Sequence, residues 1–202
     1  MEAFEQYIAT NKDRFIAEVQ EFCRQPSISA QNVGMKEMAD LVVARLNRLG
    51  ATTRLFPIEG SYPVVYGEIG EGQRTLMIYD HYDVQPPEPL ELWHSPPFAA
   101  EIREGRWFAR GVADNKGNLM SRIHAIETWL ATRGPLPLKI KFVVEGEEEI
   151  GSPNLASFAA AHRDLLQADG CLWESGGKDI AGRFMLTFGL KGICYLELEA
   201  HG

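Results

Sequence analysis

The sequence has few cysteines, and their arrangement limits the classes of protein to which it can belong. Only Cys23, Cys171 and Cys194 occur, and they form no C-x-x-C pair. An odd number of cysteines at wide spacing provides no disulfide framework. This excludes a disulfide-stabilised secreted scaffold and favours a reducing compartment.

Basic charge and long apolar runs are also scarce. The sequence has 20 lysines and arginines against 28 acidic residues, a formal net charge of −8, whereas phosphate binding needs a basic face. No apolar run approaches the ~20 residues of a membrane span. Residues 1–6 are acidic and contain no apolar signal core. We therefore expect no nucleic-acid partner, no membrane partner and a cytoplasmic location.

What is present is typical of a globular domain. The 202 residues are 45% hydrophobic and 24% charged, which is enough apolar material for a core and too much for disorder. Apolar residues at helical spacing predict helices over residues 2–24, 35–49, 115–132 and 153–166. Short apolar runs predict strands over 52–56, 63–69, 75–79, 138–144 and 170–173, a hairpin over 98–108 and a strand-rich tail over 184–199. Strands that alternate with helices predict an α/β sandwich around a largely parallel sheet.

Polar clusters follow three of the predicted strands. His81 and Asp83 come after one strand, the acidic run 145–149 after another and Glu174 after a third, while Asp114 precedes a helix. Ligand sites in such sheets form beyond the carboxyl ends of the strands. We therefore expect these side chains to converge.

Each cluster also has an ordinary explanation. His81 can ligate a metal while Asp83 orients its ring, but the pair can equally mark a polar turn. Asp114 can bridge two cations, although capping the next helix is the commoner use of such an aspartate. Glu174 is informative only as a further oxygen donor beside the others.

The acidic run 145–149 has two explanations as well. Charge runs are usually solvated loops, but this one follows a strand end and precedes a Gly-Ser helix start. Of two adjacent acids such as Glu148 and Glu149, one can bind a metal while the other acts as a general base.

Taken together, four motifs resemble a known family. They are His81-Tyr82-Asp83-Val84-Gln85-Pro86, then Trp93 with Pro97-Phe98, then Arg110-Gly111 with Asp114 and Lys116-Gly117, and last Glu148-Glu149-Ile150-Gly151-Ser152. Their order and spacing are similar to those of the co-catalytic zinc metallopeptidases. This family includes carnosinase-type dipeptidases, aminoacylase, acetylornithine deacetylase, succinyl-diaminopimelate desuccinylase and bacterial glutamate carboxypeptidase.

The resemblance implies a role for each candidate residue. His81 and Glu174 would bind one metal ion, Glu149 would bind a second, and the carboxylate of Asp114 would bridge the two ions. The peptide bond between Asp114 and Asn115 would be cis. Asp83 would orient His81, and Glu148 would be the general base, although Asp169 competes with Glu174 for its role. Two divalent ions are implied, with zinc first and manganese or cobalt able to substitute.

The resemblance also implies a three-layer sandwich whose mixed, largely parallel sheet is flanked by helices. Residues 1–188 would form the N-terminal part of the catalytic domain, and residues 189–202 would begin an inserted lid. A second histidine ligand and the rest of the lid, through which members dimerise, have no counterpart here. His201, His94, His124 and His162 are rejected as that ligand, the last two as surface or interface residues on helices. We expect the isolated chain to be a poorly active fragment.

The function implied is hydrolysis of dipeptides or small peptides by a metal-bound water and a glutamate base. The His81 motif is more similar to the dipeptidase branch than to the deacetylases. The alternative within the family is an N-acyl amino acid deacylase or desuccinylase. The alternative of another class is a metal-binding module without catalysis, against which Glu148 argues.

Overall fold

The computed structural model describes residues 1–174, 176–189, 192 and 194–202. Its centre is a five-stranded sheet with the strand order β1-β2-β6-β3-β7. These strands are β1 (Thr52–Phe56), β2 (Val64–Ile69), β6 (Lys139–Glu145), β3 (Thr75–His81) and β7 (Gly170–Leu172). All five overlap the strands predicted from apolar runs.

The sheet is mixed, as predicted. β2 pairs antiparallel with β1 and β6, whereas β3 pairs parallel with β6 and β7. In the parallel part, His81 lies opposite Glu145. The carboxyl ends of β3, β6 and β7 therefore meet at one edge of the sheet, where the predicted polar clusters begin.

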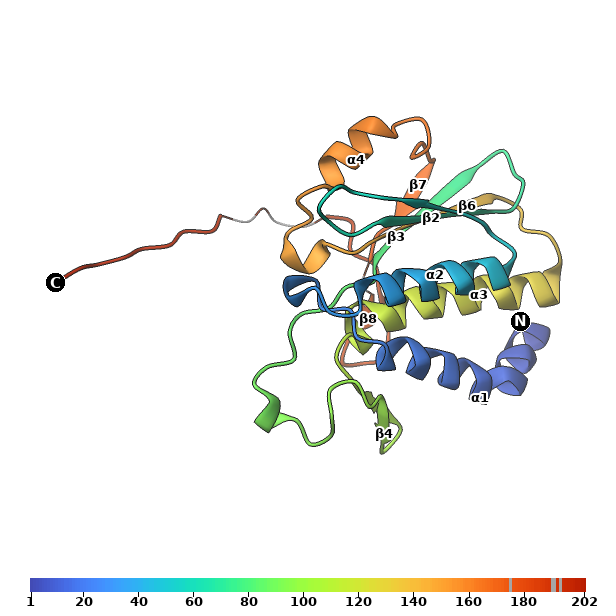
Figure 1. Ribbon diagram of the computed structural model, residues 1–202. Helices are drawn as coiled ribbons and strands as arrows, with labels where there is room; N and C mark the ends of the chain where they lie inside the picture. Colours follow the sequence, from blue (N-terminus) through green and yellow to red (C-terminus); the bar gives the residue numbers. More distant parts are fainter. Residues whose placement is uncertain (175, 190–191, 193) are drawn as a thin grey trace.

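Helices cover both faces of the sheet and complete a three-layer sandwich (Figure 1). On one face α2 (Met35–Leu49) and α3 (Gly117–Arg133) lie against the sheet and α1 (Glu2–Arg24) packs against α3, while α4 (Leu155–Ala161) covers the other face. The larger core lies beneath the three helices and includes Phe22, Met38, Leu46, Ile123 and Phe142. The smaller core lies under α4 and includes Tyr79, Val143 and Phe158.

The remaining elements are short. The predicted hairpin forms from β4 (Glu101–Arg103) and β5 (Arg106–Phe108). Its turn residues Glu104 and Gly105 have φ values of 51° and 74°, the left-handed region that two-residue hairpin turns require. Helical turns cover Ser29–Gln31, Leu90–Leu92, Val112–Lys116 and Glu148–Ile150. Among the described residues, no helix has both the length and the apolar character needed to cross a membrane.

Two predicted elements are wrong in extent. Helix α4 ends at Ala161 rather than at 166, and the buried Lys141 ammonium binds the carbonyl oxygens of Leu165 and Gln167 at 2.7 and 2.8 Å. Residues 162–166 form turns, and the segment that follows the helix is bound to β6 by this lysine.

The strand-rich tail is also wrong for the described residues. Only β9 (Phe184–Met185) is a strand there, paired with β8 (Gly177–Lys178), and 186–189, 192 and 194–202 have no regular structure. Strands persist only where a neighbour satisfies their backbone groups. Residues 190, 191 and 193 of the predicted lid strand lie outside the described residues.

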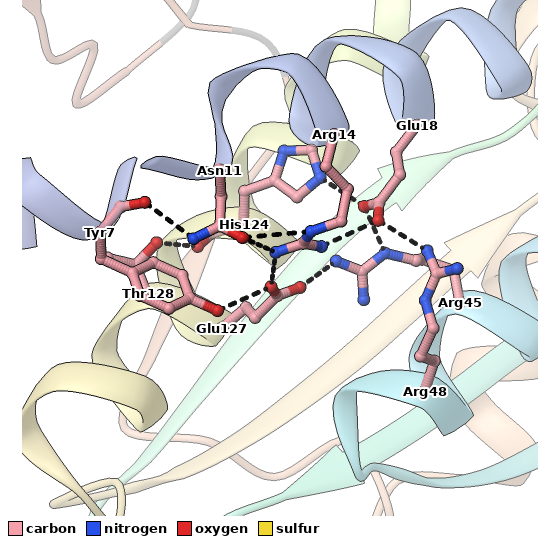
Figure 2. Close-up of polar contacts among 9 residues, drawn as sticks. All are labelled: Tyr7, Asn11, Arg14, Glu18, Arg45, Arg48, His124, Glu127 and Thr128. Carbon is pink, nitrogen blue, oxygen red and sulfur yellow. Dashed lines mark hydrogen bonds and ion pairs between the residues drawn. The ribbon is translucent and has the colours of Figure 1, made fainter. Parts of the chain in front are cut away.

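A buried polar network ties the three helices of one face together (Figure 2). Glu18 of α1 binds Arg45 of α2 at 3.1 Å and His124 of α3 at 2.8 Å, and Arg45 also pairs with Glu127 of α3. His124, expected at the surface or an interface, is only 8% exposed and lies between helices rather than at the surface. Its ring stacks on Phe15 with centroids 4.0 Å apart, which explains its burial.

We expect Glu18→Gln to lower the free energy of unfolding by about 3 kcal/mol at pH 7, as for other buried ion pairs that lose one partner. Burial alone would raise the pKa of Glu18, but its bonds to His124 and Arg14 and the charge of Arg45 lower the pKa below its usual value. A lowered pKa stabilises the fold above the unfolded value of about 4.5, and this contribution is lost as the pH falls. Urea unfolding of both proteins between pH 7 and 3 should show their difference shrinking. A constant difference would contradict this origin.

Candidate metal centre

His81 ends β3 and lies at the centre of the polar edge. Its side chain is fully buried. Nδ1 lies 3.1 Å from the backbone oxygen of Asp83 and 3.3 Å from the Asp83 carboxylate. Nε2 lies 3.0 Å from Asp114 Oδ1 and 3.1 Å from Glu174 Oε2. One ring nitrogen thus contacts Asp83, while the other faces two carboxylates from distant parts of the sequence.

Asp114 reaches this position through an irregular backbone. It lies inside the helical turn Val112–Lys116 with φ −140° and ψ 96°, which are not helical values. The Asp114–Asn115 peptide bond is cis, as the resemblance implied. No side chain caps helix α3, so the capping alternative for Asp114 is wrong. Its carboxylate instead contacts His81.

The acidic run after β6 divides into two buried and two less buried carboxylates. Glu145 accepts hydrogen bonds from Tyr79 and Ser152, and Glu147 accepts them from Asn154 and Ser61. Both residues are 2% exposed, and their hydrogen bonds hold the loop that follows β6 in place. The solvated-loop alternative is therefore wrong for these two acids.

The other two acids face the cluster. Glu148 Oε2 lies 3.9 Å from His81 Nε2, and the Glu148 side chain is 32% exposed. The backbone N–H of Glu149 donates to Asp83 at 3.0 Å, and Gln85 donates to the Glu149 carboxylate at 2.8 Å. Gln85 was assigned no role from the sequence, although its place in the His81 motif, two residues after Asp83, put it next to the site.

We expect Gly146→Ala to displace this loop. An added Cβ would lie 2.4 Å from the Tyr82 ring, which is fully buried. Overpacking of this kind costs about 1–3 kcal/mol, so the thermal midpoint should fall. Gly177→Ala is the matched control, since a Cβ there meets no atom within 4 Å. Equal midpoints for the two variants in thermal unfolding would contradict the packing argument.

The predicted residues form two groups whose ligand atoms lie within 4.8 Å of one another. One contains His81, Glu148 and Glu174, and the other contains His81, Asp114 and Glu149. Glu174 Oε2 is buried and lies 3.1 Å from His81 Nε2. Four carboxylates around one imidazole form a donor set that suits divalent cations.

The electrostatics also fit a cation. Burial lowers the pKa of His81, but the bonds to Asp114, Asp83 and Glu174 outweigh burial and raise it to about 12. Burial and the neighbouring charge of Glu174 raise the pKa of Glu148 to about 7. Without a metal ion, the positive charge of protonated His81 is what offsets the negative charges of these carboxylates, and their mutual repulsion stays strong.

The competing candidate Asp169 and the rejected histidines lie elsewhere. Asp169 accepts a hydrogen bond from the Thr75 backbone at 2.6 Å, at the opposite end of β3 from His81. His162 packs its ring 4.6 Å from Phe56, and His201 pairs with Glu199 at 3.1 Å. His94 is exposed in the loop before β4. Ser175, next to Glu174, lies outside the described residues.

Comparison with known proteins points in one direction. A profile described as peptidase family M20/M25/M40 matches residues 77–188. The chain is 32% identical to the Cys-Gly metallodipeptidase dug1 of Schizosaccharomyces pombe over 96% of the chain and 44% of that protein.

Two solved structures are also similar. One is an M20 family metallo-carboxypeptidase from Sulfolobus solfataricus, with 40% identity and a TM-score of 0.80 over 84% of this chain and 39% of that one. The other is human carnosine dipeptidase 1, with 28% identity and a TM-score of 0.78 over 86% of this chain and 41% of that one. The chain thus spans less than half the length of these relatives. The profile covers more than half of the chain and includes all six predicted site residues. The chain therefore belongs to peptidase family M20/M25/M40.

Proposed function

We propose that the protein containing this chain is a metal-dependent hydrolase that cleaves the amide bond of dipeptides or other small peptides. The convergence of His81, Asp114 and Glu174 within 3.1 Å contacts, with Glu148 beside them, carries this proposal. The names of its relatives, two dipeptidases and a carboxypeptidase, support the substrate class.

In this proposal His81 and Glu174 hold one divalent ion, Glu149 holds a second and Asp114 bridges them. The ions would polarise the substrate carbonyl and make water acidic enough to react near neutral pH. Asp83 keeps Nε2 of His81 turned toward the cluster, through contacts of 3.1 and 3.3 Å at Nδ1. Zinc is the first choice because a buried imidazole is among the donors, and manganese or cobalt would suit the oxygen-rich remainder.

Glu148 is the proposed general base. Its side chain is 32% exposed, and burial and the charge of Glu174 raise its pKa above the usual value, the direction that suits a general base near neutral pH. It would take a proton from the attacking water and deliver it to the leaving amine. A metal-binding module without catalysis would have no need of a carboxylate in this position.

A substrate panel tests the proposal. The protein is dialysed against chelator, reloaded with zinc, manganese or cobalt, and assayed with Cys-Gly, β-Ala-His, other Xaa-Gly dipeptides and N-acetyl amino acids. We expect metal-dependent cleavage of dipeptides. Cleavage of only the acylated amino acids would favour the deacylase alternative, and no cleavage with any metal would contradict the enzyme.

We further propose a cytoplasmic location and a homodimer. Cys23, Cys171 and Cys194 are all free thiols, which supports a reducing compartment. The dimer rests on the family resemblance, in which an inserted lid forms the interface. Fractionation of the source cells and light scattering of the purified protein test these two statements.

A further inference from the structure

A buried ion pair lies beside the candidate metal centre and is not used in the proposed chemistry. Asp80 of β3 is fully buried, and the side chain of its partner Arg122 of α3 is 9% exposed. Asp80 directly precedes His81, and successive strand residues point to opposite faces of the sheet. The ion pair therefore lies on the α3 side of the strand that ends in His81.

Arg122 joins the ends of two parallel strands. Its Nη1 donates to the backbone oxygen of Tyr79 at 3.2 Å, and its Nη2 donates to the backbone oxygen of Trp173 at 2.8 Å. Tyr79 precedes His81 by two residues, and Trp173 is adjacent to Glu174. One guanidinium thus holds the backbone next to both residues that face each other at 3.1 Å.

The Arg122 bonds connect the two strands beyond the point where their backbone pairing ends. In the described chain, the last paired residues of β3 and β7 are Ile78 and Leu172. Beyond them, Trp173 stacks on the Tyr79 ring with centroids 3.8 Å apart. Stacking and the Arg122 bonds therefore fix the position of Glu174 relative to β3.

Asp80 extends the link to a third segment. Its carboxylate accepts a hydrogen bond of 2.8 Å from the side chain of Asn115, which follows Asp114. The segments that carry His81, Glu174 and Asp114 are therefore connected through this one ion pair. These are the three side chains that meet at His81 Nε2.

We propose that Arg122 and Asp80 are positioning residues that hold His81, Asp114 and Glu174 at the spacing a divalent cation needs. This inference rests on the metal site proposed above. Carboxylates that crowd one imidazole repel one another, so a scaffold must hold them together before the cation arrives. The planar guanidinium suits this task because its N–H groups reach several acceptors at once, whereas an ammonium group acts as a point charge.

Cobalt(II) binding tests the inference, because its visible absorption reports the coordination geometry. Co²⁺ is titrated into metal-free wild type, Arg122→Met, Arg122→Lys and Arg133→Met. The last is a matched control, an exposed arginine at the end of the same helix. We expect both Arg122 variants to bind Co²⁺ about 10–100-fold more weakly, with altered visible bands, as is typical when an outer-shell partner is lost. The control should match wild type.

Thermal unfolding of the metal-free proteins separates positioning from general stability. If the folded Arg122 variants melt earlier but bind Co²⁺ with wild-type affinity and bands, the inference is overturned. If Arg122→Met does not fold, Arg122→Lys is judged by the same criteria. Wild type that binds no Co²⁺ would overturn the metal site and this inference together, whereas normal binding by both wild type and the variants overturns the inference alone.

Discussion

Glu148→Gln is expected to lower kcat by about 10²–10⁴-fold in the catalytically competent protein that contains this chain, the usual contribution of a general base. Glutamine has nearly the same shape but cannot accept the proton of the attacking water. Metal binding should persist, because the proposed ligands are His81, Asp114, Glu149 and Glu174. Dipeptide hydrolysis and metal content are measured on the same preparation.

The matched control for this prediction is Glu59→Gln, an exposed glutamate in the loop before β2. It changes the net charge by the same amount and should leave kcat unchanged. If Glu148→Gln lost its metal together with activity, Glu148 would be a ligand. Its presence in the group of His81 and Glu174 makes that outcome a specific competitor. Unchanged kcat would exclude Glu148 as the base.

His81→Gln is expected to weaken metal binding by more than the ~10–100-fold that outer-shell changes cost, because it removes the one histidine that the described residues place in the cluster. The wild-type affinity should also depend on pH. Since the pKa of His81 is raised to about 12, its imidazole carries a proton near pH 7 and must lose it when the metal binds. Apparent affinity should therefore rise about tenfold per pH unit between about pH 6 and 8.

Calorimetry in buffers of different ionisation enthalpy measures this proton. Wild type should release close to one proton from His81 for each ion bound there, and His162→Gln, a histidine substitution outside the site, should behave in the same way. An affinity that does not change with pH would show that His81 is neutral before the metal binds. Wild-type affinity in His81→Gln would remove His81 from the site.

Much of the fold could be predicted from local pattern. Residues 2–24 and 35–49 match the helices to the residue because apolar spacing, Pro26 and Gly50 mark their ends. The early end of α4 could not be predicted, because it coincides with bonds from Lys141 on a strand that is distant in sequence. Irregular structure in the described tail was missed because strand propensity says nothing about whether a partner strand is available.

The candidate site shows the same division. His81 and Glu148 were found because motif order identified them, and the strand-end rule predicted that they would meet. The sequence did not show which acids of the run 145–149 are structural and which face the site. Only the fold shows that Glu145 and Glu147 bind hydroxyl and amide groups beneath the loop. Arg122 was missed because two of its acceptors are backbone oxygens, which leave no trace in side-chain identity, and the third, Asp80, lies 42 residues away in the sequence.

Metal content is the most direct test of the account. Wild type and Asp114→Ala are purified, dialysed and analysed for zinc, manganese and cobalt, with circular dichroism to establish that both are folded. The proposed bridging role of Asp114 predicts between about one and two ions per chain in wild type and their loss in the variant. A folded wild type without metal, or an Asp114→Ala protein that keeps the full wild-type content, would contradict the bridged metal centre.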